Sequence, residues 1–120
     1  MWGVSALLDD RTIDGLANYY AAQTPSPGRN GDAGLIARGR GIFTDGVPAK
    51  GVPACRSCHG DQAEGTTVFP RLAGQHASYV YSQLKLFSTR LRPHGTVMAG
   101  VVRNLSNDDL RALAEYVQSR

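Results

Sequence analysis

The residues with the clearest chemical potential form one short run, Cys55-Arg56-Ser57-Cys58-His59. Two thiols at this spacing on a tight helical turn can each add across one vinyl group of the same porphyrin. The adjacent histidine is then delivered beneath the iron, where its imidazole can serve as an axial ligand. The C-x-x-C-H spacing therefore predicts one covalently attached haem c, anchored by Cys55 and Cys58 and ligated by His59.

Three other roles for the two thiols compete with haem attachment. A thioredoxin-like dithiol belongs with a βαβ pattern, and no strand pattern is visible in this chain. A structural zinc site needs four ligands, and the only further candidates are His76 and His94. A disulfide across so short a loop gains little chain entropy. The sequence favours haem attachment over all three.

A second axial ligand is needed if the iron is to carry electrons rather than bind gases. Met98 is the candidate: its thioether is a soft, neutral donor that favours ferrous iron and raises the reduction potential. The plainer interpretation is a methionine that fills the core. We expect Met98 to lie in an irregular segment, 90–100, because Pro93 and Gly95 interrupt helical periodicity. His94 and His76 are the rival ligands.

Residues after the C-x-x-C-H run supply candidates for the surroundings of the haem. Pro70 is one candidate, because a proline carbonyl near the proximal histidine can accept a hydrogen bond from its Nδ1, which would fix the ring and strengthen its ligation. An ordinary loop proline is the alternative. Further candidates to line the pocket or to hydrogen-bond the propionates, each of which could equally be a surface residue, are Arg71, Gln75, Tyr79 and Gln83.

The elements that must position these residues are helices. Apolar residues recur at helical spacing in four segments: 9–22, 31–45, 76–88 and 106–119. Asp9 or Asp10, Asp32 and Ser106 stand where N-caps are expected, and Asp109 completes a capping-box pattern with Ser106. The 14 glycines and 6 prolines predict long loops between short helices, among them 23–30 and 46–54. The fold class is therefore all-α.

Packing predictions follow from the same patterns. The last helix should bury a stripe consisting of Leu110, Leu113, Ala114 and Val117. Phe43 and Tyr116 should meet near the small residue Gly39, where the helices at 31–45 and 106–119 approach each other.

An internal repeat links the two ends of the chain. Residues 1–22 align without a gap to residues 98–119, with seven identities: Met1/Met98, Gly3/Gly100, Val4/Val101, Leu8/Leu105, Leu16/Leu113, Ala17/Ala114 and Tyr19/Tyr116. We interpret this as a duplication, which makes 1–30 the end of a preceding, similar domain and 31–120 a domain of its own. The helix at 9–22 must then bury its apolar face against the 31–120 domain, in a dimer, or in a larger multidomain protein.

Charge and hydropathy exclude several classes of function. The net charge of +3 comes from scattered basic residues, not from the dense stripe of a nucleic-acid surface. No run approaches the roughly 18 apolar residues of a membrane span. The start shows no basic segment followed by an apolar run, so we expect an exported protein to be represented here by its mature chain or by an excised piece.

These features together resemble class I c-type cytochromes, and more closely the cytochrome c4 family. The resemblance covers about 31–120 and is carried by GDAGLIARGRGIF, VPACRSCHG, FPRLAGQHASYVYSQLKLF and MAGVVRNLSNDDLRALAEYV. It implies short helices and long loops around the haem, thioether bonds at Cys55 and Cys58, His59 as the proximal and Met98 as the distal ligand, and Pro70 as the acceptor for His59.

The resemblance also implies a function. Members of this family are periplasmic carriers that exchange electrons with dehydrogenases, reductases or terminal oxidases, so we expect single-electron transfer and no catalytic residues. The chain departs from the two-haem pattern of cytochrome c4 because it has one attachment motif. The alternative function is a haem enzyme or a gas or peroxide sensor, in which the distal site of the iron is open.

Overall fold

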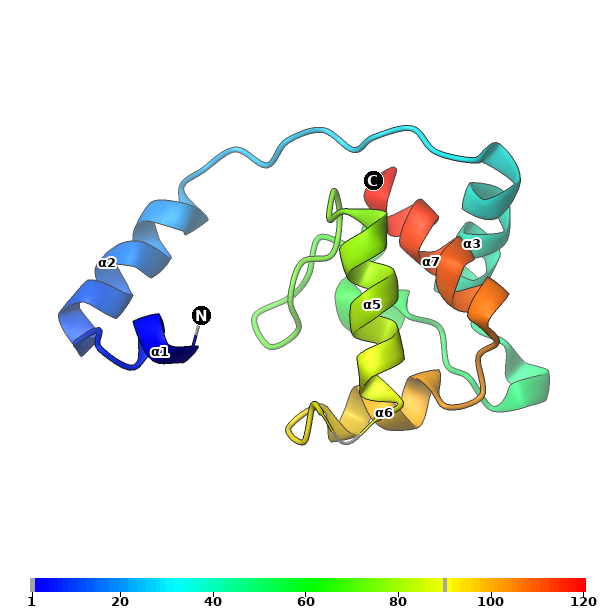
Figure 1. Cartoon of the computed structure of the whole chain (residues 1–120). Helices are drawn as coiled ribbons and strands as arrows, with labels where there is room; N and C mark the ends of the chain where they lie inside the picture. The colour runs from blue at the N-terminus through cyan, green and yellow to red at the C-terminus, as the bar shows by residue number, and fades with distance from the viewer. Residues whose placement is uncertain (1, 90) are drawn as a thin grey trace.

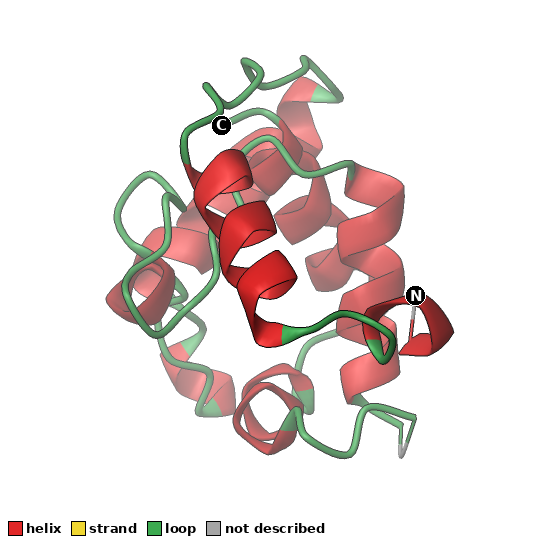
Figure 2. Ribbon diagram, turned by 90° about the vertical axis from the view of Figure 1, so that its left-hand side faces the viewer, coloured by secondary structure: helices red, strands yellow, loops and turns green. Residues whose placement is uncertain are grey.

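The computed structural model describes residues 2–89 and 91–120. Helices dominate this part of the chain (Figure 2), and its one β feature is an isolated antiparallel bridge between Val47 and Val52. The helices are α1 (Trp2–Ser5), α2 (Asp10–Ala21), α3 (Ala33–Asp45), the 3-10 helix η1 (Pro48–Lys50), α4 (Arg56–His59), α5 (Ala77–Phe87), α6 (Thr96–Val102) and α7 (Asn107–Gln118). The prediction of an all-α fold is confirmed. Met1, and with it the first pair of the internal repeat, lies outside the described residues.

The crossing of α3 and α7 forms the centre of the fold. Asp32 caps α3 by accepting a hydrogen bond from the Leu35 amide at 2.8 Å. Gly39 lies against the backbone of Ala112, where a Cβ atom would collide with the carbonyl oxygen, so only glycine permits this approach. Phe43 and Tyr116 meet beside it with ring centroids 5.2 Å apart. The predicted contact near Gly39 is confirmed.

Helix α7 is the most deeply buried element, and it packs against both α3 and α5 (Figure 1). Its capping box is present, because Ser106 accepts from the Asp109 amide and the Asp109 carboxylate accepts from the Ser106 amide. The predicted stripe of α7 is buried together with residues of α3, α5 and α6 in one core. The stripe is Leu110, Leu113, Ala114 and Val117.

The prediction that 90–100 is irregular is wrong for its second half. Helix α6 begins at Thr96, and Gly95 is its N-cap residue. Pro93 therefore lies outside the helix, and neither residue interrupts it. We gave these two helix breakers too much weight, because seven residues show too little periodicity to reveal a helix. Met98 consequently sits on a helical turn rather than in a loop.

The N-terminal helices form a separate arm. Figure 1 shows α1 and α2 apart from the other helices, joined to them by the extended linker. The end of this linker is fixed, because the Arg29 amide donates to the Gln118 carbonyl at 2.9 Å. Helix α2 contains no buried residue. Of the alternatives predicted for its apolar face, packing against the 31–120 domain is therefore not the one observed.

No helix in the described ranges is both long enough and apolar enough to cross a membrane.

Candidate cofactor site

Helix α4 brings the two cysteines to adjacent positions on one turn. The amides of Cys58 and His59 both donate to the Cys55 carbonyl, at 3.2 and 3.0 Å. Both thiols are half-buried and neither is in a disulfide. Cys55 packs against the hydrophobic core. This is the compact turn that C-x-x-C-H spacing predicts.

The electrostatics of Cys55 oppose a role as a reactive dithiol. The pKa of the Cys55 thiol is raised to about 11, mainly by burial; a backbone hydrogen bond lowers it by less, and the neighbouring Cys58 adds the smallest contribution, which raises it. Cysteines that act in thiol–disulfide exchange have a lowered pKa, which supplies the nucleophilic thiolate. Cys55 stays protonated at neutral pH, so its surroundings suit a thiol that will be bonded to an apolar group.

His59 is oriented by a single hydrogen bond. The side chain is buried, with 6% of its surface exposed, and Nδ1 lies 2.9 Å from the Pro70 carbonyl oxygen. A carbonyl can only accept, so Nδ1 carries the proton and Nε2 has its lone pair free for a metal. The Phe69 ring lies beside the imidazole, with centroids 6.0 Å apart. The contact expected of Pro70 is thus present.

The loop between His59 and α5 places that carbonyl through its own backbone hydrogen bonds. The Gly65 amide donates to the His59 carbonyl at 2.8 Å, and the amides of Leu72 and Ala73 donate to the Ala63 carbonyl at 2.8 and 2.9 Å. Gly65 has a φ of +84°, and a Cβ atom there would lie 2.5 Å from the Arg71 amide nitrogen. Gly65 is therefore a positioning residue that the sequence analysis missed, because nothing local distinguishes it from other loop glycines.

The three candidates for the distal ligand differ in their surroundings. Met98 is half-buried and packs against the hydrophobic core. His76 and His94 are exposed. Within the described ranges, no three His, Cys, Asp or Glu side chains gather around a common point where they could share a metal ion. The surroundings favour Met98, and they give the zinc alternative no third ligand beside the cysteines.

The four polar candidates do not form one cluster of shared hydrogen bonds. Arg71, Gln75 and Tyr79 are exposed. The side chain of Gln75 accepts from the His76 amide at 2.9 Å, and that of Gln83 accepts from Arg92 at 3.0 Å. Tyr79 and Gln83 share one face of α5, because they lie one turn apart. Their roles beside the haem stay predictions.

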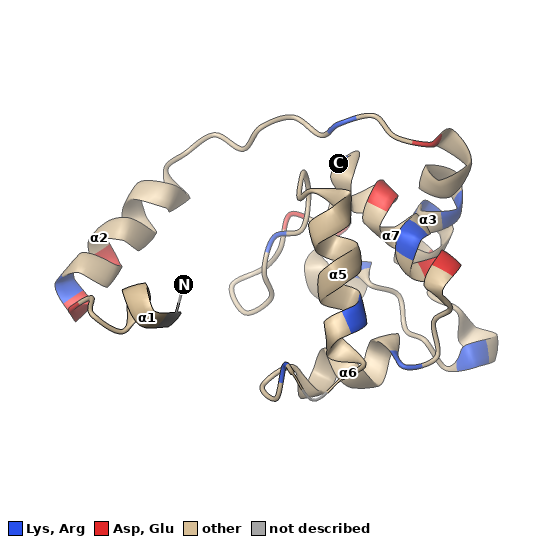
Figure 3. Cartoon of the chain, viewed as in Figure 1, with Lys and Arg blue, Asp and Glu red and all other residues tan. Residues whose placement is uncertain are grey.

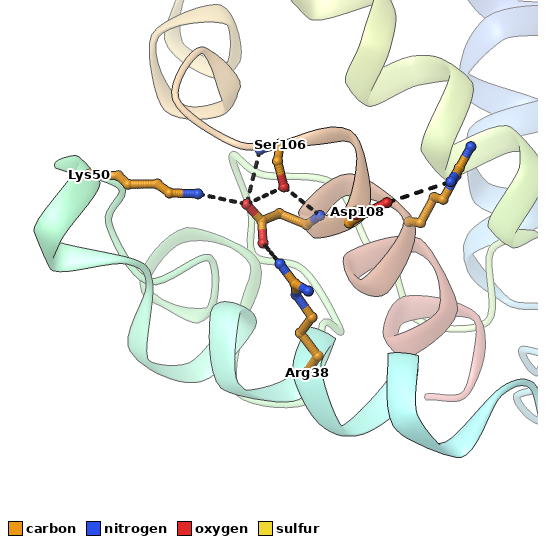
Figure 4. Close-up of polar contacts among 6 residues, drawn as sticks. Arg38, Lys50, Ser106 and Asp108 are labelled. Carbon is orange, nitrogen blue, oxygen red and sulfur yellow. Dashed lines mark hydrogen bonds and ion pairs between the residues drawn. The ribbon is translucent and has the colours of Figure 1, made fainter.

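A buried carboxylate connects α3, η1 and α7. Asp109 is 5% exposed; its Oδ1 accepts from Arg38 at 2.6 Å and its Oδ2 accepts from Lys50 at 2.9 Å. Figure 4 shows both cations pointing toward this carboxylate, which also binds Ser106. Burial alone would raise the pKa of Asp109, but the hydrogen bonds from Arg38, Lys50 and Ser106 outweigh it and hold that pKa well below its usual range.

Lys50 extends this connection to both sides of the site. Its carbonyl accepts from Nδ2 of Asn104 at 2.8 Å, while its ammonium group binds Asp109. Lys50 is the last residue of η1, shortly before Cys55, and Asn104 follows the helix that carries Met98. One residue thus joins the segments before the first anchor and after the candidate distal ligand. Sequence spacing gave no signal for this long-range contact.

Comparison with known proteins shows the family of this chain. The family model described as cytochrome c matches residues 36–120, which include the attachment turn, the Pro70 loop and α6. The chain belongs to the cytochrome c family. With its single C-x-x-C-H run, this cytochrome carries one covalently bound haem c. The residues present fit that group: two unpaired thiols lie one turn apart, and the adjacent imidazole has Nε2 free.

The individual proteins to which the chain is similar include cytochromes c4 and a thiosulfate dehydrogenase electron acceptor. Cytochrome c4 of Pseudomonas aeruginosa is 39% identical over 98% of this chain and 61% of its own length. The thiosulfate dehydrogenase electron acceptor of Stutzerimonas stutzeri is 32% identical over 97% of this chain and 56% of its own length. The structure of cytochrome c4 from Acidithiobacillus ferrooxidans superposes with a TM-score of 0.87 at 33% identity, covering 100% of this chain and 70% of that one. The chain thus spans about 60% of these two curated relatives.

Proposed function

We propose that this cytochrome transfers single electrons between redox proteins outside the cytoplasm, and that it has no enzymatic activity of its own. The observation that carries this proposal is the hydrogen bond from His59 to the Pro70 carbonyl beside the two attachment thiols. It holds an imidazole in one tautomer and one orientation, as an axial ligand requires. The haem, when bound, supplies an iron that alternates between the ferric and ferrous states.

The residues of the site divide into three roles. Cys55 and Cys58 hold the haem through thioether bonds. His59 is the proximal ligand, oriented by Pro70, and Met98 is the distal ligand, whose neutral sulfur favours ferrous iron. Because His59 and Met98 would both hold the iron, no position on it would be left for a substrate. The residues that we propose to line the pocket or contact the propionates are Arg71, Gln75, Tyr79 and Gln83.

We also propose that 1–30 is the end of a preceding cytochrome domain and that 31–120 is a cytochrome domain of its own. In the gap-free alignment of the repeat, the whole of α2 (Asp10–Ala21) aligns with the whole of α7 (Asn107–Gln118). The similarity to cytochrome c4 of P. aeruginosa extends over 98% of this chain, so it includes the arm. In the whole protein, a further domain would then cover the apolar face of α2.

For location and partners, we propose the periplasm and an exchange of electrons with a dehydrogenase, a reductase or a terminal oxidase. One relative is named as the electron acceptor of thiosulfate dehydrogenase, which supports a dehydrogenase as one class of donor.

The decisive experiment is the absorption spectrum of the oxidised holoprotein and of its Met98→Ala variant. We expect the weak near-infrared band of methionine–iron bonding in the wild type and its loss in the variant, with a lower reduction potential and faster cyanide binding. His94→Ala is the matched control and should change none of these. High-spin features in the wild-type spectrum would instead support an enzyme or a sensor with an open distal site.

An unchanged potential in Met98→Ala, together with a changed one in His94→Ala, would transfer the distal role to His94. Retention of haem through acid–acetone extraction tests the thioether bonds separately. A colourless protein with two free thiols, from cells with intact haem-ligation machinery, would contradict the whole proposal.

A further inference from the structure

A polar pocket lies beside the attachment turn, next to the crossing of α3 and α7. Residues from three separate parts of the chain line it: Arg40, Thr44, Arg56, Asp61, Gln62, Tyr116 and Arg120. The side chains that dominate this lining are three arginines, one each from α3, α4 and the residues just after α7. The sequence analysis took the basic residues as scattered, and only the fold brings these three together.

The positive charge of the pocket is only partly neutralised. Asp61 is the one carboxylate in the lining; it pairs with Arg56 at 3.5 Å and is itself 75% exposed, so the pair is a weak surface contact. Arg120 lies over the Tyr116 ring at 5.5 Å. Within the described part of the chain, the guanidinium group of Arg40 forms no hydrogen bond or ion pair. Among the lining side chains, three guanidinium groups thus face a single carboxylate.

The pocket is directly coupled to the haem-attachment turn. Arg56 stands between Cys55 and Cys58 in the sequence and lies on α4 itself. A group that binds at Arg56 is thus one residue away along the backbone from a haem anchor. Arg40 and Thr44 lie on α3 and Tyr116 lies on α7, and these two helices pack against each other, so the backbone on this side of the pocket is rigid. A partner held here would sit close to the covalent connection between protein and haem.

We propose that this arginine pocket is the docking site for carboxylate side chains of an acidic redox partner protein, an inference that rests on the proposed electron-carrier function. Guanidinium groups bind carboxylates in a planar, bidentate geometry. Thr44 and Gln62 add neutral hydrogen-bonding groups beside them. The surplus charge would steer an acidic surface toward the attachment turn and so raise the rate of encounter.

The first test measures electron transfer to a small anion. Ferrous holoprotein gives one electron to ferricyanide, a trianion, and the rate is followed by stopped flow at low ionic strength. We expect Arg40→Gln and Arg56→Gln each to slow this reaction about threefold, because one attractive charge is removed next to the pocket. Arg11→Gln on the distant arm changes the net charge equally and should have little effect. Arg11 belongs to α2, which Figure 3 shows apart from α3 and α7.

A cationic oxidant, tris(phenanthroline)cobalt(III), provides the opposite control, because its rate should not fall in the pocket variants. Equal slowing of the ferricyanide reaction in Arg11→Gln and the pocket variants would overturn the proposal, since net charge would then explain the effect. The absorption spectrum of each variant checks that the haem remains attached.

The second test uses no electron transfer. A hexaglutamate peptide is titrated into the holoprotein, and backbone amide shifts are followed by NMR. We expect shifts at Thr44 and Gln62 that disappear in Arg40→Gln and persist in Arg11→Gln. Tighter binding of inorganic phosphate than of the peptide at these amides would overturn the docking proposal and indicate a small-anion site. Shifts that arise at other amides instead would also overturn the proposal. If the protein bound the peptide but showed no reversible redox activity, the electron-carrier function would be contradicted, whereas carboxylate binding at the pocket would still be supported.

Discussion

Helices α2 and α7 are matching elements of the internal repeat, but they differ in how deeply they are buried. They have the same length, occupy the same register in the repeat, and begin with the same device: Asp9 accepts from the Thr12 amide, as Ser106 does from that of Asp109. Yet α7 buries seven of its residues and α2 buries none. Burial is thus set by the neighbours of a helix and not by its own pattern of apolar residues.

Individual positions give the size of this difference. Leu113 is 4% exposed and its counterpart Leu16 is 41% exposed; Leu110 is 3% exposed and its counterpart Ile13 is 46% exposed. Each fully buried side chain of this kind contributes about 1.5–3 kcal/mol to folding. Helix α7 gains this energy from α3 and α5, whereas α2 has no equivalent of α3 beside it.

The largest expected effect is the difference in stability between alanine variants of Leu113 in α7 and Leu16 in α2. Leu113→Ala should lower the free energy of unfolding of the holoprotein by about 3–4 kcal/mol, because it leaves a cavity in the core. Leu16→Ala should cost less than about 1 kcal/mol, because the side chain is half in water. Urea denaturation followed by haem absorbance measures both. Similar losses in the two variants would mean that α2 is packed in solution as α7 is.

A smaller effect tests the ionic contact that α7 has and α2 lacks. Asp109→Asn should cost about 2–3 kcal/mol at pH 7, because Arg38 and Lys50 lose a buried partner. The folded-state pKa of Asp109 lies below its unfolded value, so its stabilisation is fully present above about pH 4 and is lost as the pH falls toward the folded pKa. The difference between wild type and variant should therefore shrink below about pH 4. A constant difference down to pH 2 would show that packing, not charge, is responsible.

The smallest effect compares the two caps. Ser106→Ala should cost about 1 kcal/mol of global stability, because an amide at the start of α7 loses its acceptor. Asp9→Ala removes the same kind of hydrogen bond from α2 but should leave global unfolding unchanged and only reduce the helix content of the arm. Circular dichroism and denaturation of the two variants measure this. A global loss in Asp9→Ala would contradict the independence of the arm.

The sequence was sufficient wherever the cause of a structure is local. The attachment turn at Cys55–His59 and the caps at Asp32 and Ser106 depend on a few neighbouring residues, and all were predicted. Helix α6 was missed because its flanking Pro93 and Gly95 carry a stronger signal than its own seven residues. A local pattern can be misjudged in this way when the element is short.

Features that need distant residues were out of reach. The bonds of Lys50 to Asp109 and Asn104, and the gathering of three arginines around one pocket, join segments far apart in the chain. The exposure of α2 is the same kind of failure, because its apolar stripe reads like that of α7. The contact between His59 and Pro70 was a candidate from the sequence and was implied by the resemblance, whereas the Gly65 turn that positions the Pro70 carbonyl was not anticipated.

The two bonds made by Lys50 have a consequence for motion. Its ammonium group binds Asp109 in the first turn of α7, and its carbonyl accepts from Asn104 in the connection between α6 and α7. The segment before the haem-anchoring cysteines and the segment that follows Met98 should therefore unfold locally as one cooperative unit, and not separately. Amide protons in both would exchange with deuterium at a common rate, and weakening either bond would quicken exchange on both flanks of the iron.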